Sequence, residues 1–145
     1  MNTLKRLIKN IYELSFIVTT MGIIYLLIEF IYKGSTYWQM AVIGGIAGML
    51  VGLINKIFPW NTPLWTQGSI GMIVATICEF IGGCYLNLYM HYSMWSYIGL
   101  PFNLLGQVCL YFSITWFFVS LLGIFIDDFI RWKLFKEAKP RYKIF

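Results

Sequence analysis

Charged side chains are scarce in this chain. They account for 12% of its 145 residues, whereas 59% are hydrophobic and 19% are aromatic. A soluble globular domain has about 25% charged residues, which keep its surface hydrated. The composition therefore excludes a soluble domain and predicts an integral membrane protein, with residues 1–145 forming a single transmembrane domain.

Several motifs of common activities are also missing. The chain has no HExxH pair and no serine, histidine and carboxylate placed for nucleophilic catalysis, so we do not expect an enzyme. Its three cysteines, Cys78, Cys84 and Cys109, have no metal-type spacing, so we expect no metal site and no cofactor. The GxxxxGK[ST] phosphate loop is absent, which means that any ATP hydrolysis needs a separate ATPase chain.

Four apolar segments are long enough to cross a hydrocarbon layer of about 30 Å. They run over residues 12–32, 37–57, 69–89 and 104–126. The first is too long for a signal peptide and has no small-residue cleavage site, so we interpret it as a retained span. Residues 90–103 are aromatic and carry no Lys, Arg, Asp or Glu. We therefore predict an all-α membrane protein with four transmembrane helices and an interfacial aromatic loop between the third and fourth.

The basic residues predict the orientation. With both termini in the cytoplasm, ten of the eleven Lys and Arg residues lie inside and only Lys33 lies outside, as the positive-inside rule requires. The basic tail, residues 127–145, would then meet anionic lipids at the cytoplasmic face. Because the basic residues stand at the ends of apolar spans, we expect no nucleic-acid partner.

Small residues recur at helical spacing in two of the spans. Such faces let a second helix backbone approach closely, within the chain or between copies of it in a homo-oligomer. The predicted helix-packing residues are Gly44, Gly48 and Gly52 in the second span, and Gly71, Ala75 and Gly82 in the third.

Glu79 lies on the small-residue face of the third span, near mid-membrane. A charged carboxylate there costs roughly 2.5–3.5 kcal/mol, so its presence needs an explanation. One interpretation is a group that handles a proton or cation, or contacts a polar substrate. The other is a neutral carboxyl group hydrogen-bonded across a helix interface. In both cases we expect its polar partners on the fourth span, at Ser113 and Thr115.

Further polar residues fall at one level near the outer ends of the spans, where they could line a vestibule or simply be interfacial. These are Glu29, Gln39, Asn87, Asn103 and Gln107. The single histidine, His91, has no ligand partner nearby in the sequence and is a weak candidate for a site.

At the inner end of the fourth span, Asp127 and Arg131 are four residues apart and can pair on one helix face. Together with Asp128, they form either a salt bridge at the membrane exit or a docking point for a cytoplasmic partner.

A set of short motifs from about Gly44 to the end of the chain is similar to those of a known family. They are FPW at 58–60, PLW at 63–65, Glu79, Phe80, Gly82, Asn87, Trp95, Tyr97, LPFNLLGQ at 100–107, Trp116, Phe117, Asp127, Asp128, Arg131 and the ending KPRY. In these residues the chain resembles the family labelled putative ABC-transporter permeases of type IV. The resemblance implies a small bacterial membrane protein with several spans.

Two functions are compatible with these observations. The first is a transporter or permease component in the bacterial cytoplasmic membrane, with a polar intramembrane site formed by Glu79, Asn87, Asn103 and Gln107. The second is an oligomerising membrane protein, such as a scaffold, an assembly factor or a holin-like protein, that associates through its glycine faces.

Overall fold

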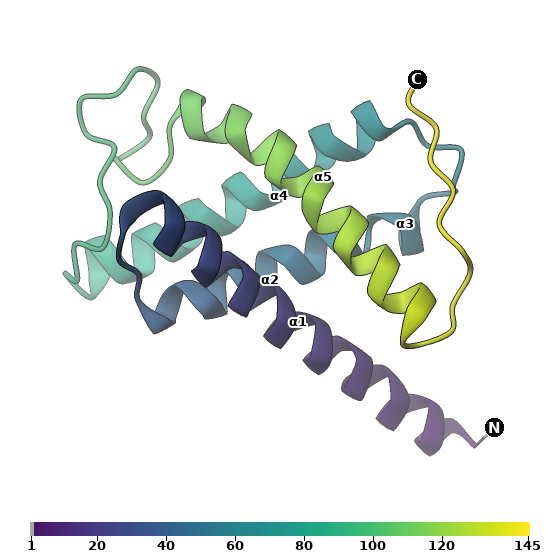
Figure 1. Cartoon of the computed structure of the whole chain (residues 1–145). Helices are drawn as coiled ribbons and strands as arrows, with labels where there is room; N and C mark the ends of the chain where they lie inside the picture. Colours follow the sequence, from purple (N-terminus) through teal and green to yellow (C-terminus); the bar gives the residue numbers. More distant parts are fainter. Residues whose placement is uncertain (1) are drawn as a thin grey trace.

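The chain folds into four long helices and two short ones in a computed structural model that describes residues 2–145 (Figure 1). Four helical segments are long and apolar enough to cross a membrane, so the predicted all-α, four-span fold is confirmed: Thr3–Lys33, Trp38–Ile57, Leu64–Tyr89 and Leu110–Lys133. The helices are α1 (Thr3–Lys33), α2 (Trp38–Gly52), α3 (Ile54–Ile57), α4 (Leu64–Gly83), the π-helix η1 (Cys84–Tyr89) that continues α4, and α5 (Leu110–Lys133).

The first helix begins well before the predicted span. The Asn2 side chain caps it by accepting a hydrogen bond from the Leu4 N–H at 3.3 Å. It ends at Gly34, whose φ of +78° lets its N–H return to the Phe30 carbonyl. Local capping therefore sets both ends of α1, and its basic first turns extend beyond the apolar segment.

The start of the fourth span was predicted wrongly. The helix begins at Leu110 and not at residue 104. Residues 104–107 form a tight turn, in which the Gly106 N–H donates to the Asn103 side chain at 3.1 Å. Leu105 and Gly106 both have positive φ there. Such a side-chain-to-backbone bond competes with helix formation, which explains the later start.

The long helices form two antiparallel pairs. Helix α1 packs along α2, α4 packs along α5, and α2 also contacts both α4 and α5. The backbones of α1 and α5 approach each other at few residues, although Ile17 and Met21 of α1 share a hydrophobic cluster with Ile130 of α5. In Figure 1, α1 and α5 lie in front of α2 and α4, and both chain termini lie at the end opposite the 90–109 loop.

The predicted glycine faces make contacts inside the chain. A Cβ atom on Gly48 would lie 2.7 Å from Met21 Cβ of α1, and one on Gly71 would lie 2.5 Å from Ser120 Cβ of α5. Only a residue without a side chain fits such contacts. The other predicted packing residues are also close-packed: Gly44 against Tyr25, Gly52 against Asp127 and Gly82 against Ile43, with Ala75 buried.

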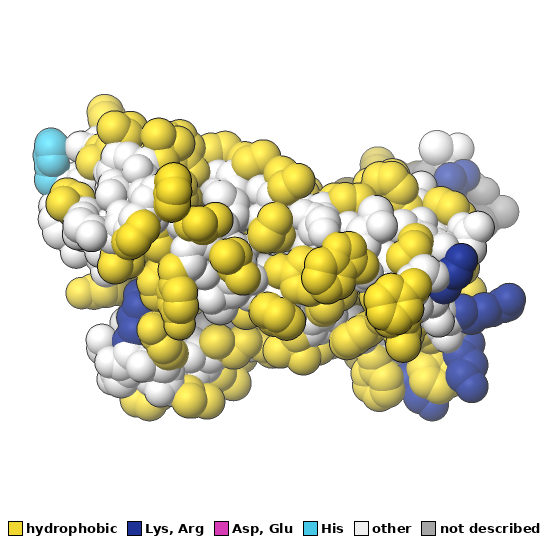
Figure 2. Space-filling model, turned by 90° about the horizontal axis from the view of Figure 1, so that it is seen from above, with side chains coloured by type: hydrophobic (Ala, Val, Ile, Leu, Met, Phe, Trp, Pro, Cys, Tyr) yellow, Lys and Arg dark blue, Asp and Glu magenta, His cyan; other side chains and the backbone are white. Residues whose placement is uncertain are grey.

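Most acidic residues are buried, whereas the basic residues lie at the surface with the exception of Arg131. Figure 2 shows hydrophobic side chains over the middle of the molecule, most of the visible Lys and Arg side chains at one end, and no acidic side chain on this face. Five of the six acidic residues are buried: Glu13, Glu29, Glu79, Asp127 and Asp128. Because carboxylates are costly in an apolar interior, each of them needs hydrogen-bond partners or a positive charge.

Candidate functional site

The carboxyl group of Glu79 lies inside the helix bundle, with 7% of the residue exposed. The Tyr97 hydroxyl of the 90–109 loop donates to one of its oxygens at 2.7 Å. The indole N–H of Trp116, on α5, donates to the other oxygen at 2.9 Å. Glu79 therefore joins three segments of the chain: α4, α5 and the loop.

The expected partners of Glu79 on the fourth span were wrong. Ser113 instead accepts a hydrogen bond from Thr76 at 3.1 Å, and the Thr115 hydroxyl bonds to a carbonyl of its own helix. Trp116 lies on the same face of α5 as Ser113, one turn further along. The prediction missed Trp116 because it considered hydroxyl groups as partners of Glu79 and not an indole N–H.

The two donors to Glu79 differ in what they can do. An indole N–H only donates, whereas a tyrosine hydroxyl can donate or accept. Burial and the nearby Glu79 carboxylate raise the pKa of Tyr97 above its ordinary value, so its hydroxyl keeps its proton. The Trp116 and Tyr97 contacts therefore suit both protonation states of Glu79, which can take up or release a proton without losing either hydrogen bond.

A cavity of about 90 Å³ lies beside Glu79, between the four long helices and the loop. Small residues of α2 and α4, among them Gly44, Ala47 and Ala75, form part of its wall and leave the space open. Trp95 and Tyr97 of the loop border the cavity as well. Glu79 is thus a buried carboxyl group on the wall of a small, largely apolar chamber.

A second carboxylate, Glu29 of α1, borders the same cavity. It accepts hydrogen bonds from Lys33 and from Thr36, each at 2.7 Å. With 6% of the residue exposed, Glu29 does not extend to the surface. The two carboxylates of the cavity differ because Glu29 has a lysine partner, while none of the ion pairs formed by residues 2–145 includes Glu79.

The structure brings together only part of the predicted outer polar cluster. Asn87 of η1 donates to the Gln107 side chain at 2.8 Å and accepts from the Met94 N–H at 2.7 Å. The carbonyl of Gln107 accepts from the Trp95 indole at 3.0 Å. Asn87 and Gln107 therefore fasten the loop that carries Trp95 and Tyr97 against the helix bundle.

The remaining members of that cluster lie apart. Asn103 is exposed and bonds within its own turn, and Gln39 borders a separate groove between α2 and η1. His91 is exposed in the loop with a φ of +58°. Residues 2–145 contain no group of three or more His, Cys, Asp or Glu side chains that could hold a metal ion.

The acidic pair at the C-terminal end of α5 is buried inside the protein. Asp127 accepts from Arg131 at 2.7 Å, and Asp128 accepts from Asn55 at 2.6 Å and from Tyr142 at 2.9 Å. Burial and the Asp128 carboxylate raise the pKa of Tyr142, so its hydroxyl remains a donor. Asp127, Asp128 and Arg131 form an internal network and not the exposed docking point that the sequence allowed.

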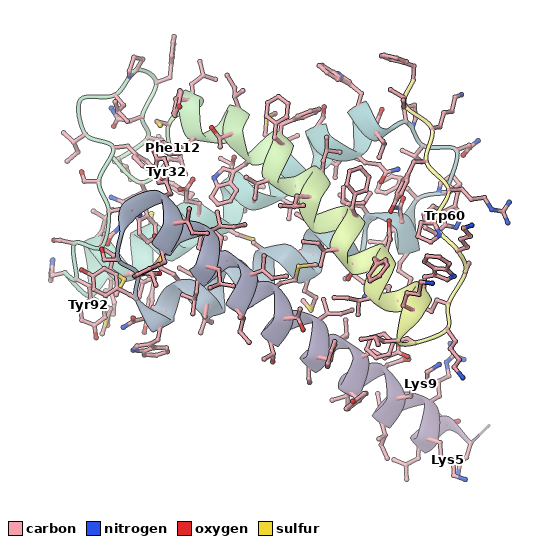
Figure 3. All side chains as sticks on the ribbon, in the orientation of Figure 1. Lys5, Lys9, Tyr32, Trp60, Tyr92 and Phe112 are labelled. Carbon is pink, nitrogen blue, oxygen red and sulfur yellow. The ribbon has the colours of Figure 1, made fainter. Side chains whose placement is uncertain are left out.

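The C-terminal tail explains this burial. The Lys143 carbonyl accepts from the Leu64 N–H at 2.7 Å, which ties the tail to the start of α4. The Tyr142 ring packs against Trp60 and Phe125. Figure 3 shows Trp60 beside the returning tail. The tail therefore lies across the 58–63 loop and covers the acidic network.

The comparison with known families agrees with the resemblance that the sequence motifs indicated. A family model described as putative ABC-transporter type IV matches residues 11–145. The chain belongs to this family. Neither a curated protein nor a solved structure gives a significant match. The family name indicates an ABC-transporter component, and together with the four apolar helices it identifies an integral membrane protein.

Three residues of the Glu79 site had no role in the sequence-based predictions. They are Tyr25, whose ring centroid lies 5.9 Å from that of Trp116, and the two donors, Tyr97 and Trp116. Both donors are among the residues in which the chain resembles the type IV family. In an apolar sequence an aromatic residue is usually interpreted as part of the hydrophobic core. Only the resemblance to the family could therefore have drawn attention to the two donors.

Proposed function

We propose that the chain is the membrane-embedded component of a transporter, and that Glu79 is its intramembrane site for a proton or a cation. The observation that carries the proposal is a buried carboxyl group with only neutral hydrogen-bond donors at the wall of a cavity. A carboxylate without a positive partner is costly in an apolar environment, so a ligand that supplies positive charge is stabilised there.

In this proposal Asn87 and Gln107 position the site and do not touch the ligand. They hold the loop whose Tyr97 binds Glu79. Asn103 acts one step further away, because its side chain shapes the turn that precedes Gln107. The chain itself has no catalytic role, and the ATPase of the transporter is a separate chain.

The alternative of an oligomerising scaffold or holin-like protein loses its main support. It relied on glycine faces that are free to meet a second copy of the chain. Gly44, Gly48 and Gly52 instead pack against Tyr25, Met21 and Asp127 of the same chain. Other surfaces would have to carry any homo-oligomer.

We also propose that both termini face the cytoplasm of a bacterial cell. The two ends lie at the same end of the helix bundle (Figure 1), together with most of the basic residues. Anionic lipids of the cytoplasmic leaflet suit such a surface. A reporter that is active only in the periplasm should give no signal after Phe145, and a strong signal there would contradict this orientation.

The transporter proposal is tested on the tagged full chain in its native membrane. We expect an ATP-hydrolysing chain to copurify with it. The wild type should restore a deletion strain, and Glu79→Gln should not. The control variant is Glu13→Gln, which should also restore the strain, because Glu13 is a buried residue of α1 that lies outside the cavity. Absence of an ATP-hydrolysing partner would refute the transporter role, and full complementation by Glu79→Gln would refute the ionisable role of Glu79.

A further inference from the structure

Aromatic and aliphatic side chains close the seam between α1 and α5, whose backbones approach each other at few residues. At the loop end, the ring centroids of Tyr32 and Phe112 lie 6.4 Å apart, and Figure 3 shows the two rings together. In the middle, Tyr25 meets Trp116 at 5.9 Å, and near the chain termini Phe16 meets Phe135, just past the end of α5, at 5.7 Å. Between these two pairs, Ile17 and Met21 of α1 pack with Ile126 and Ile130 of α5 in one hydrophobic cluster. That cluster closes the part of the seam near the termini, so the part where side-chain rotations can open the seam lies beside Tyr25 and Trp116.

The cavity beside Glu79 lies directly behind this seam. Its wall on that side consists of partly exposed apolar residues, including Ile24 of α1 and Leu122 of α5, the latter 47% exposed. Gly123 contributes no side chain, and a Cβ atom there would meet only Val51, at 3.8 Å. On the loop side, Trp95 and Tyr97 border the cavity. This side of the wall therefore consists of side chains that are themselves partly exposed to the surrounding lipid.

The residues around the cavity favour a ligand that has a positive charge next to an apolar group. Glu79 lacks a cationic partner, and the rings of Tyr25 and Trp116 border the same space. Aromatic faces attract ammonium groups, particularly where water is excluded. The single nearby cation, Lys33, already pairs with Glu29. An ammonium group therefore complements the site, whereas an anion would leave Glu79 facing a like charge.

The size of the cavity limits what can enter it. A volume of about 90 Å³ is smaller than the roughly 150 Å³ of an apolar protein cavity that holds one benzene molecule. Drug-sized ligands occupy pockets of about 300–1,000 Å³. Only a head group and the first few carbons fit beside Glu79, so a longer apolar body has to extend through the seam into the bilayer.

We infer that this site binds an organic ammonium compound with an apolar tail, which enters sideways from the lipid between α1 and α5. The ammonium group lies against Glu79 and the rings of Tyr25 and Trp116, and the tail leaves past Gly123. This inference rests on the proposed function of Glu79 as an intramembrane cation site, and it names the class of cation and its route.

Brominated chain compounds test the inference, because bromine quenches tryptophan fluorescence on contact and Trp95 and Trp116 border the cavity. The full chain in phosphatidylcholine nanodiscs is titrated with 3-bromoundecylammonium, 3-bromo-1-undecanol and 3-bromoundecanoate, in which the bromine lies among the first few carbons and therefore enters the cavity with the head group. We expect saturable quenching by the ammonium compound at a concentration about tenfold below that of the alcohol, and none by the carboxylate. Equal quenching by the ammonium compound and the alcohol would overturn the inference.

Two variants locate the binding. Glu79→Gln should remove the preference for the ammonium compound over the alcohol. Gly123→Leu should abolish saturable quenching, because the new side chain fills the cavity where the structure has room for it. The matched control is Thr115→Leu, which adds a similar side chain on the exposed face of α5. An unchanged ammonium preference in both Glu79→Gln and Gly123→Leu would place the binding elsewhere and refute the site.

Failure of this inference can be told apart from failure of the proposed function. If an ATP-hydrolysing chain copurifies and Glu79→Gln fails to complement, but the ammonium compound shows no preference, the class of ligand is wrong and the transporter role stands. If the ammonium preference depends on Glu79 but no ATPase copurifies, the ligand class stands and the transporter role is wrong.

Discussion

The protein contains two kinds of buried carboxylate site, and they are built differently. At the end that carries the termini, Asp127 pairs with Arg131, while Asp128 bonds to Asn55 beside it. Beside the cavity, Glu79 receives hydrogen bonds only from neutral groups. The site near the termini thus contains its own positive charge, whereas the cavity site does not.

This difference separates a structural role from a ligand-binding one. An internal ion pair leaves little for a ligand to contribute, and breaking it leaves a charge stranded in the interior. A carboxyl group with neutral partners gains when a proton or cation arrives. The comparison therefore predicts that variants of the site near the termini mainly change stability, and that variants of Glu79 mainly change binding.

The largest effect on stability is expected for Arg131→Met. It leaves Asp127, which is fully buried, without its positive partner and should lower the free energy of unfolding by about 3–5 kcal/mol. Thermal unfolding in detergent measures the loss, with exposed Arg141→Met as the control. The double variant Asp127→Asn/Arg131→Met should recover much of the stability. If it does not, the buried charge is not the cause.

The next largest effect is expected for Gly48→Leu, which places a side chain where Met21 already lies. Overpacking of this kind costs about 1–3 kcal/mol and disturbs the α1–α2 contact. Met49→Leu is the control, because it replaces a neighbouring core side chain by one of similar volume. Equal melting temperatures for the two variants would contradict the packing that the structure shows.

For Glu79 the two substitutions should differ from each other. Glu79→Ala leaves the Trp116 N–H without an acceptor, which costs about 1–3 kcal/mol. Glu79→Gln should stay close to the wild type, because its amide oxygen accepts from Trp116 and its amide nitrogen donates to the Tyr97 oxygen. Thermal unfolding of the three proteins provides the measurement. A Gln variant as unstable as the Ala variant would show that the negative charge itself supports the fold.

The smallest effect is expected for Tyr142→Phe. The substitution removes one hydrogen bond to Asp128 and keeps the ring that packs on Phe125, so the loss is about 1 kcal/mol and confined to the tail. Trypsin should cut the tail faster at Arg141, while the melting temperature changes little. Exposed Tyr89→Phe serves as the control. An unchanged cleavage rate would mean that the Asp128 contact does not hold the tail.

Some features of the fold follow from local sequence alone. Segments such as Tyr37–Ile57 are apolar over a bilayer thickness, and an apolar helix of that length satisfies its own backbone in lipid whatever its neighbours are. The small-residue faces were also predictable from local sequence, since Gly44 and Gly48 are four residues apart and fall on one side of any α-helix. The late start of α5 was not, because it depends on a turn held by the Asn103 side chain.

The sequence by itself determined the membrane environment, the four spans and the presence of an ionisable group at Glu79, because these depend on composition and helical periodicity. Tertiary structure decided which groups meet. It brought Tyr97 and Trp116, 18 and 37 residues along the chain from Glu79, to the two carboxyl oxygens, and it folded Tyr142 back onto Asp128. Such pairings depend on the angles at which the helices cross and on where the loops fold back against them. The periodicity of a single segment contains no information about either.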